Sequence, residues 1–284
     1  MTTGTLYLIA TPIGNLGDMT FRAIETLKTV NVIAAEDTRH SRKLLQHYLI
    51  TTPMVSLHAF NETPRVSQLM SRLEQGESVG IISDAGTPLI SDPGFPLVRA
   101  AQLANIQVVP IPGACAAITA LCAAGLPTDR FIFEGFLPAK TTARQQRLST
   151  VRTDPRTLVY YESPHRIIAT LTDMITVFGP NRRATIGREL TKQFETIRQD
   201  ELRTLLDWVQ QNPEQQLGEF VVVVAGADVE ESSSDQEVEN MLTVLLSELP
   251  TKQAATLCAK MTGRKKNELY EKALALSGKI QSSD

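Results

Sequence analysis

The chain has 284 residues, 42% of them hydrophobic, which is enough for a sizeable core and for more than one domain. Its formal net charge of −3 excludes a protein that is basic as a whole, so any nucleic-acid contact must come from local basic patches. The three cysteines and four histidines show no metal-ligand spacing, and neither a signal peptide nor an apolar run of ~20 residues is evident. We therefore expect a cytoplasmic protein without a metal centre and without membrane contact.

The first half of the chain alternates short apolar runs with helical patterns. This alternation is typical of a parallel, doubly wound α/β sheet. The pattern ends at a turn signal, Gly125, Leu126 and Pro127, so we predict an N-terminal α/β domain over residues 1–126. The expected strands are 6–10, 32–35, 79–82 and 106–110, and the expected helices are 20–29, 38–48, 64–74, 95–104 and 114–124.

A second α/β domain with a mixed sheet is expected over residues 127–227. The β-branched run at 220–225 is its clearest strand. Further strands are expected at 131–136, 158–161 and 185–187, with helices at 164–177 and 201–211. The cleft between the two domains is the expected site.

After Gly226 the chain becomes polar and acidic, which predicts a linker over 228–236. Three short helices are expected in a tail over 237–284, with a glycine turn before the last one, as in a helix-turn-helix unit. That last helix opens with Arg264, Lys265 and Lys266, which suit phosphate contacts. The alternative is a small helical tail that covers core surface, and the pattern leaves both interpretations open.

Two loops rich in glycine and proline carry most of the information about function. ATPIGN, at 10–15, and SDAGTPLISDPG, at 83–94, each follow a strand-like run and precede a helix. In an open α/β sheet such loops lie at the carboxyl ends of the strands, where ligands bind. Neither is a phosphate-binding motif, so the loops predict a small polar ligand held by main-chain atoms.

Three further segments follow strands in the same way. PGACAA, at 112–117, opens a helix with small residues that permit close approach of a ligand or simply tight packing. In YESPHR, at 161–166, Ser163 and Pro164 fit a helix start, where His165 and Arg166 favour an anion such as an RNA phosphate. GRELTK, at 187–192, places alternating charges at a strand end. Ordinary capping and a solvated loop are the alternatives.

Basic residues also gather near Arg39 and Lys43, whereas aromatic residues are thinly interleaved with them. Base stacking on an aromatic platform is therefore not the expected mode of nucleic-acid binding. Phosphate contacts from scattered basic loops fit the sequence better.

Together these motifs resemble the tetrapyrrole methylase superfamily, the class III S-adenosylmethionine-dependent methyltransferases. The closer resemblance is to the ribosomal RNA small subunit methyltransferase I family, which 2′-O-methylates a cytidine of 16S rRNA. The motifs that carry it span nearly the whole chain in order: LYLIATPIGNLGDMTFRA, EDTRHSRKLL, SDAGTPLISDPG, PIPGACAAITAL, YYESPHR, GRELTKQFE and TKQAATLCAKMTGRKKNELYEKAL. Tetrapyrrole enzymes usually show G-x-G-P-G and G-D-P in the two loops, so ATPIGN and SDAGTP favour the RNA branch.

The resemblance implies two α/β domains that bind S-adenosylmethionine in their cleft, a homodimer, and the small ribosomal subunit with its 16S rRNA as partner. The implied cofactor-binding residues are Pro12, Ile13, Asp84, Ala85, Gly86, Thr87, Cys115, Ala116, Phe136, Ser163 and Leu190. Residues expected to bind RNA are Arg39, Lys43, His165, Arg166, Arg188, Arg264, Lys265 and Lys266, with the tail as the docking element.

Methyl transfer to a ribose 2′-OH mainly requires alignment of the hydroxyl with the methyl group. A general base assists because the hydroxyl is weakly acidic, and Glu162, Glu189 and His165 are candidates. Lys192 or Arg188 would offset developing negative charge. The sequence does not rank these candidates, and the residues expected to be catalytic are Glu189, Lys192 and Glu162.

Two other functions are compatible with parts of this pattern. One is a small-molecule methyltransferase acting on a tetrapyrrole, which the tail and the altered loops disfavour because a small substrate needs no nucleic-acid module. The other is a regulator without enzymatic activity that binds DNA through the tail and senses a ligand through the α/β part.

Overall fold

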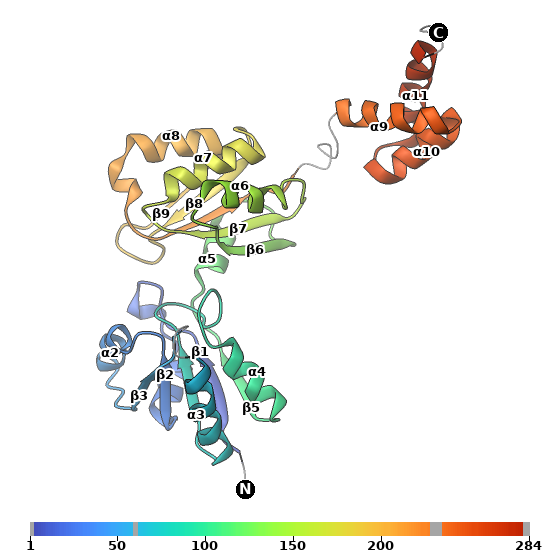
Figure 1. Cartoon of the computed structure of the whole chain (residues 1–284). Coiled ribbons are helices and arrows are strands. Elements are labelled where there is room, and N and C mark those ends of the chain that lie inside the picture. Colours follow the sequence, from blue (N-terminus) through green and yellow to red (C-terminus); the bar gives the residue numbers. More distant parts are fainter. Residues whose placement is uncertain (1–2, 59–61, 228–234, 281–284) are drawn as a thin grey trace. The chain divides into compact units, whose positions relative to one another are not determined.

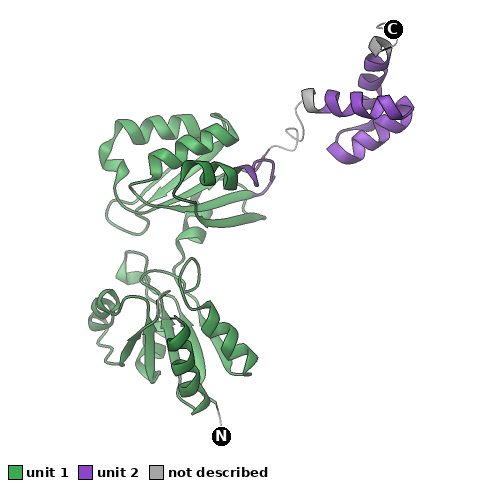
Figure 2. Ribbon diagram, viewed as in Figure 1, with its two compact units in different colours: residues 1–148, 157–225 green, residues 149–156, 226–284 purple. Residues whose placement is uncertain are grey.

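The computed structural model describes residues 3–58, 62–227 and 235–280, and divides the chain into two compact units. The first unit comprises residues 1–148 and 157–225, and the second comprises 149–156 and 226–284 (Figure 2). Residues 228–234 of the predicted linker lie outside the described residues. The first unit contains both α/β sheets, and the second contains the helical tail.

A parallel five-stranded sheet, in the order β3-β2-β4-β1-β5, forms the N-terminal part of the first unit (Figure 1). Its register pairs Leu6 of β1 with Val79 of β4 and with Val108 of β5. Parallel strands bring their carboxyl ends to one edge of the sheet, and this edge carries the loops of interest. The strands are β1 (Thr5–Ile9), β2 (Val32–Ala35), β3 (Met54–Ser56), β4 (Val79–Ile82) and β5 (Gln107–Ile111).

Helices cover both faces of this sheet, as its all-buried strands β2 and β4 require. Leu73 of α3 and Leu97 of α4 pack in one core cluster, while Leu27 of α1 and Leu45 of α2 pack in another. These helices are α1 (Phe21–Thr29), α2 (Thr38–His47), α3 (Glu62–Glu74) and α4 (Phe95–Leu103), with the short 3-10 helix η1 at Leu16–Asp18; α5 (Ala116–Ala123) follows β5 and packs on the second sheet. The expected doubly wound parallel sheet is confirmed.

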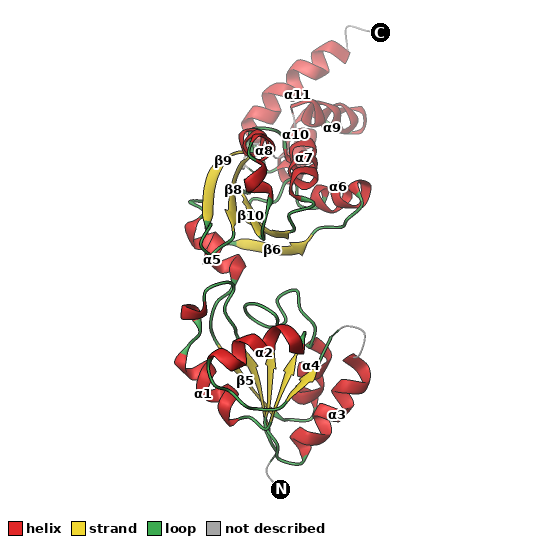
Figure 3. Ribbon diagram, turned by 90° about the vertical axis from the view of Figure 1, so that its left-hand side faces the viewer, coloured by secondary structure: helices red, strands yellow, loops and turns green. Residues whose placement is uncertain are grey.

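The second sheet is mixed, in the order β6-β7-β10-β8-β9 (Figure 3). β6 runs parallel to β7, whereas β10 is antiparallel to both β7 and β8. Helix α5 packs on one face through Ala117, Ala120 and Leu121, next to Val221 and Val223 of β10. The elements are β6 (Phe131–Phe136), α6 (Thr141–Ser149), β7 (Thr157–Glu162), α7 (Ile167–Phe178), β8 (Arg183–Arg188), β9 (Thr196–Glu201), α8 (Leu202–Gln211), η2 (Pro213–Gln216) and β10 (Phe220–Val224).

Four features of the first unit differ from the sequence-based expectation. The strands β3 and β9 and the helix α6 were not predicted. The predicted start of α7 at Ser163 and Pro164 is wrong, because α7 begins at Ile167 with Arg166 at its N-cap. The segment before it is a turn in which the Arg166 amide donates to the Ser163 carbonyl, and helical bonding begins only with the Thr170 amide and the Arg166 carbonyl.

The second unit contains three helices, α9 (Asp235–Glu248), α10 (Thr251–Thr262) and α11 (Lys266–Ile280), as the hydrophobic periodicity predicted. They share a core that includes Val238, Leu242, Cys258 and Leu269. Gly263 ends α10 in the left-handed conformation, with φ of 71°, which a glycine adopts without a steric penalty. Within the described part of the chain, every helix is too short or too polar to cross a lipid bilayer.

Candidate functional site

The loops at the carboxyl ends of β1, β2, β4 and β5 are joined by hydrogen bonds into one cradle. Thr11 and Gly86 exchange two main-chain hydrogen bonds, of 2.9 and 3.1 Å, which tie the ATPIGN loop to the SDAGTP loop. The Asp37 amide donates to Asp84 Oδ1 at 3.0 Å, and Thr87 Oγ1 donates to the Ala114 carbonyl at 3.0 Å. Each loop is thus fixed by its neighbour, which preorganises the edge of the sheet for a ligand.

The backbone of this cradle requires glycine at two points. A Cβ on Gly113 would lie 2.9 Å from Ala10 Cβ, so the approach of these loops depends on the missing side chain. Gly86 has φ of 81° beside Ile13. The same loop holds Leu89 and Ser91 at φ of 73° and 78°, conformations that cost energy in side-chain-bearing residues and cluster at functional sites.

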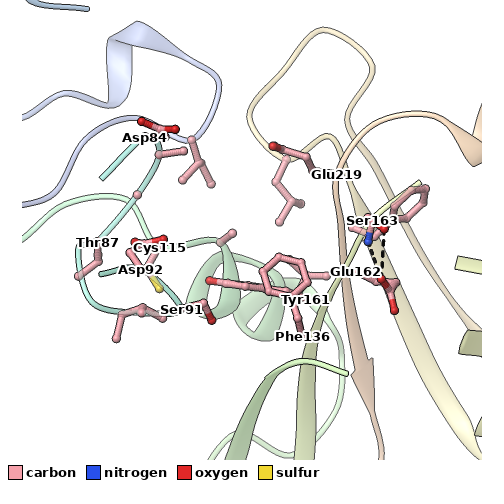
Figure 4. A pocket seen from close by; sticks show the side chains of 18 of the residues that line it. Asp84, Thr87, Ser91, Asp92, Cys115, Phe136, Tyr161, Glu162, Ser163 and Glu219 are labelled. Carbon is pink, nitrogen blue, oxygen red and sulfur yellow. Dashed lines mark hydrogen bonds between the residues drawn. The ribbon is translucent and has the colours of Figure 1, made fainter. Parts of the chain in front are cut away.

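A cavity of about 530 Å³ opens above the cradle, within the first unit (Figure 4). Asp84, Asp92 and Cys115 lie on one side of it, and Tyr161, Glu162 and Glu219 lie on the other. The volume is in the range of small-molecule sites. The lining residues are Ile13, Glu36, Asp84, Ala85, Gly86, Thr87, Ile90, Ser91, Asp92, Cys115, Ala116, Phe136, Tyr161, Glu162, Ser163, Pro164, Leu190, Glu219, Phe220 and Val221.

The cavity is acidic: among the described residues that line it are five carboxylates and neither a lysine nor an arginine. Burial, followed by the charge of Glu36 and then of Asp84, raises the pKa of Asp92 to about 6. Burial and the charge of Asp84 also raise the pKa of Glu36. Carboxyl groups held this way have an unfavourable charge that a bound cation would offset.

Of the eleven residues expected to bind a cofactor, the structure brings ten to the wall of this cavity, and Pro12 lies instead in a neighbouring recess. The wall residues that sequence reasoning did not include are chiefly Glu36, Asp92, Tyr161 and Glu219. Glu36 follows β2 directly and Asp92 belongs to the second glycine-rich loop, so their positions after strands were the available signal. Tyr161 lies in β7 and Glu219 directly precedes β10, both in the second sheet. Their place in the cavity wall therefore depends on the tertiary structure.

Glu162 lies in the cavity wall, but its carboxylate is fully engaged. One oxygen accepts from the Ser163 amide at 2.7 Å and the other from Thr170 Oγ1 at 2.6 Å. Arg166 Nε approaches the first oxygen at 3.4 Å, and the Glu162 side chain is 0% exposed. These contacts tie the carboxylate to its own turn and to α7, a structural role that is an alternative to the expected one as a general base.

Glu189 and Lys192, the other two expected catalytic residues, are not among the residues that line the cavity. Lys192 Nζ lies 2.8 Å from Glu189 Oε1 and 2.9 Å from Glu219 Oε2. Although burial raises the pKa of Glu189, the hydrogen bonds from Lys192 and from the Glu219 amide hold it below its ordinary value. Glu189 therefore stays ionised and anchors Lys192 beside Glu219, which does line the cavity.

Lys192 also packs its alkyl chain on the first loop. A Cβ on Gly14 would lie 2.4 Å from Lys192 Cγ, so only glycine leaves room for this side chain. We expect Gly14→Ala to displace Lys192 from its two carboxylates and to lower about tenfold the methyl transfer that the sequence resemblance implies, with the unfolding midpoint changed by only a few °C. Enzyme turnover and thermal unfolding measured side by side check this prediction, and unchanged turnover would contradict it.

The residues expected to bind RNA are divided between the two units and differ in their local contacts. Lys43 lines the neighbouring recess, and His165 is exposed beside the turn before α7. Arg39 forms a two-point ion pair with Asp37, through Nε at 3.3 Å and Nη2 at 3.1 Å. In the second unit, Lys265 and Lys266 are exposed and Arg264 pairs with Glu268.

Two of these arginines have internal partners instead of a free guanidinium. Arg188 is 7% exposed, and its guanidinium donates to the carbonyls of Leu217, Phe194 and Glu214 at 2.6, 3.1 and 2.8 Å. Arg166 donates to the carbonyls of Leu137 and Pro138. These bonds use guanidinium donors of both arginines inside the protein. The structure therefore argues against the expected phosphate contacts of Arg166 and Arg188.

Comparison with known proteins gives this geometry a context. Residues 5–206 match the family model described as Tetrapyrrole (Corrin/Porphyrin) Methylases, and residues 232–277 match the RsmI C-terminal HTH domain. The protein named Ribosomal RNA small subunit methyltransferase I from Pseudomonas aeruginosa is 56% identical over 98% of this chain and 100% of its own length. The chain belongs to the ribosomal RNA small subunit methyltransferase I family. The relative of the same name from Haemophilus influenzae is 51% identical, over 96% of this chain and 97% of that one.

Solved structures show the same fold at much lower sequence identity. A uroporphyrin-III C-methyl transferase from Thermus thermophilus, complexed with S-adenyl homocysteine, is 17% identical with a TM-score of 0.53, over 78% of this chain and 97% of that one. A diphthine synthase is 13% identical with a TM-score of 0.59, over 78% and 90%. The family therefore shares the two-sheet architecture with the wider methylase fold, and the helical second unit is the part matched by its own C-terminal model.

Proposed function

We propose that this protein transfers a methyl group from S-adenosylmethionine to the ribose 2′-OH of a cytidine in 16S rRNA of the small ribosomal subunit. The observation that carries the proposal is the acidic, loop-lined cavity at the carboxyl edge of the first sheet, in a chain that belongs to an rRNA methyltransferase family. S-adenosylmethionine, when bound, supplies a methyl group on a positively charged sulfur.

The cavity suits this cofactor in charge and in shape. Glu36, Asp84 and Asp92 provide negative charge for a sulfonium and an ammonium group. The Ala85 amide, in a loop that Thr11 fixes through its two hydrogen bonds to Gly86, suits a polar contact. Apolar side chains such as Ile13 and Leu190 suit the remainder of the molecule. The known complex of a distant structural relative with S-adenyl homocysteine supports the same assignment.

This chain's own residues contribute mainly positioning. The hydrogen-bonded loops hold the cavity wall rigid, so that a hydroxyl can be aligned with the methyl group without reorganisation of the protein. Lys192, set between Glu189 and Glu219, contributes a positive charge at the edge of an otherwise acidic wall. Burial and neighbouring charges raise the pKa of Asp92 to about 6, which suits this wall residue to accept a proton near neutral pH, whereas the Glu162 carboxylate is occupied by Ser163 and Thr170.

The RNA assignment draws on the family and on the second unit. The relatives at 56% and 51% identity bear the name of an rRNA small subunit methyltransferase, and the C-terminal helices match a model described as an HTH domain. The exposed Lys265 and Lys266 at the start of α11 fit phosphate contacts. A homodimer acting in the cytoplasm on 16S rRNA or on the small subunit completes the proposal.

The test is methyl transfer from tritiated S-adenosylmethionine to small ribosomal subunits, free 16S rRNA and tetrapyrrole precursors in parallel. We expect label in the rRNA, in a nuclease-resistant dinucleotide that identifies a 2′-O-methylated cytidine. Label in the tetrapyrrole alone would overturn the RNA substrate and keep the cofactor. Cofactor binding without any transfer would favour a ligand-sensing regulator.

A further inference from the structure

A second recess, of about 220 Å³, adjoins the acidic cavity in the first unit. Its wall combines the first loop, at Pro12 and Gly14, with the first two turns of α2, at His40 and Lys43. Asp84 lines both hollows, and Ile13 lines the acidic cavity while its two neighbours line the recess. The two hollows therefore border the same two loops.

The two hollows differ in charge. The acidic cavity has five carboxylates and no lysine or arginine among its described lining residues, whereas the recess carries Lys43 and His40 beside the shared Asp84. Lys43 and its neighbour Arg42 are exposed, and across the described ranges neither forms an ion pair. Arg39, one turn earlier, is already neutralised by Asp37. Asp84 is oriented by the Asp37 amide, so its carboxylate is held in place at the boundary between the hollows.

This contrast limits where an RNA strand can run. A phosphodiester placed among the five carboxylates of the cavity would be repelled, since like charges at short range in a partly desolvated site repel each other strongly. The target ribose must nevertheless reach that cavity for its hydroxyl to meet the cofactor. Its flanking phosphates then require a cationic site within about one nucleotide of the cavity, and the recess satisfies this requirement.

We propose that the recess between the first loop and α2 binds a phosphodiester of the RNA next to the methylated ribose, with Lys43 as its principal cationic contact and His40 beside it. The inference rests on the proposed function and specifies how that site holds its substrate. Lys43 acts here as a substrate-positioning residue, and the first loop, which borders both hollows, sets the spacing between phosphate and cofactor.

The experiment compares Lys43→Ala, Lys43→Glu and Lys43→Arg with Arg99→Ala. Arg99, on α4, is a matched control: it is exposed, forms no ion pair in the described part of the chain, and lines neither hollow. Methyl transfer to small ribosomal subunits gives KM and kcat, and equilibrium dialysis of S-adenosylmethionine gives the cofactor affinity of each variant.

We expect Lys43→Ala to raise KM for the subunit about tenfold, Lys43→Glu to raise it further, and Lys43→Arg to restore it within about threefold. The salt dependence of RNA affinity should weaken by about 0.7 in its log–log slope, as for one lost single-strand phosphate contact. Cofactor affinity should stay within about twofold, because Lys43 does not line the acidic cavity.

Outcomes separate this inference from the proposed function. If the native protein methylates rRNA while Lys43→Ala and Arg99→Ala behave alike, the recess is not the phosphate site and the proposed function stands. If the Lys43 variants lose cofactor affinity as much as they lose RNA affinity, the recess supports the cavity structurally and the inference is overturned. If the native protein binds S-adenosylmethionine without methylating rRNA, the proposed function fails and this inference fails with it.

Discussion

Replacement of Asp92 by asparagine is expected to make the free protein more stable while weakening its hold on S-adenosylmethionine. The folded protein raises the pKa of Asp92 from an ordinary value of 3.8 to about 6, through burial and through the charges of Glu36 and Asp84. The contribution of Asp92 to the free energy of unfolding is therefore fully present below about pH 4, and it is lost as the pH rises through 6. At neutral pH the ionised carboxylate destabilises the fold, and asparagine removes this cost.

The size of the effect follows from the shift and from the exposure of the group. About two pKa units correspond to ~3 kcal/mol for a fully buried group, and the partial exposure of Asp92 reduces this to the order of 1 kcal/mol. Thermal unfolding at pH 7 should therefore shift upward by a few °C in Asp92→Asn. The difference should vanish near pH 4, and an equal shift at both pH values would contradict the electrostatic explanation.

The same carboxylate makes cofactor binding dependent on pH. With a pKa of about 6, the ionised fraction of Asp92 rises from about a tenth at pH 5 to about nine tenths at pH 7. A cation binds the ionised form better, so S-adenosylmethionine affinity should rise severalfold over this range and flatten in Asp92→Asn. S-adenosylhomocysteine, whose sulfur is uncharged, is the matched control ligand. A flat profile for S-adenosylmethionine in the unaltered protein would contradict the prediction.

The fold was largely predictable because its central strands are buried on both faces. VIAA, VGII and FVVVV, in β2, β4 and β10, are continuous apolar runs, and parallel or central strands leave such runs in the sequence. β9 lies at the edge of its sheet and reads TIRQDE, so it has no apolar signal to distinguish it from a loop. β3 is a three-residue, half-buried edge strand, and it was not predictable for the same reason.

The site divides in a similar way between what local sequence indicates and what only tertiary structure decides. Loops that follow parallel strands must meet at one edge, so Ile13, Asp84 and Cys115 were identifiable from position alone. The roles of the charged residues could not be identified in this way, because a sequence does not show whether a cationic side chain faces solvent or an internal acceptor. Arg188 contacts three carbonyls inside the protein, and Asp92 acquires its raised pKa only when the fold buries it and brings the charge of Glu36 near.

Arg144 is the clearest case of a charged residue whose role only the tertiary structure shows. Its replacement is expected to have the largest effect on stability. In the sequence it belongs to a polar stretch, yet in α6 it is 2% exposed and lies 2.6 Å from Asp173 of α7. Its guanidinium also donates to the carbonyls of Pro138 and Ala139 at 3.4 and 3.1 Å. Arg144→Met should lower the free energy of unfolding by about 3–5 kcal/mol, because it leaves the Asp173 carboxylate buried with the Gln145 amide but without its cation.

The double variant Arg144→Met with Asp173→Leu separates the cost of an unpaired charge from the value of the pair. Replacing both partners by apolar groups should recover most of the lost stability in chemical denaturation, since buried ion pairs contribute little net energy. If the double variant is as unstable as the single one, the contacts to the two carbonyls, rather than the charge, carry the effect.

Activity should not recover to the same extent. The segment that Arg144 holds also accepts hydrogen bonds from Arg166, at the carbonyls of Leu137 and Pro138, and Arg166 approaches Glu162 in the cavity wall. Without Arg144 this segment keeps its hydrogen bonds from Arg166 but loses those from Arg144, and it directly follows Phe136 of the same wall. A double variant with near-native stability and reduced kcat/KM would therefore show that the buried pair serves the shape of the site more than the stability of the fold.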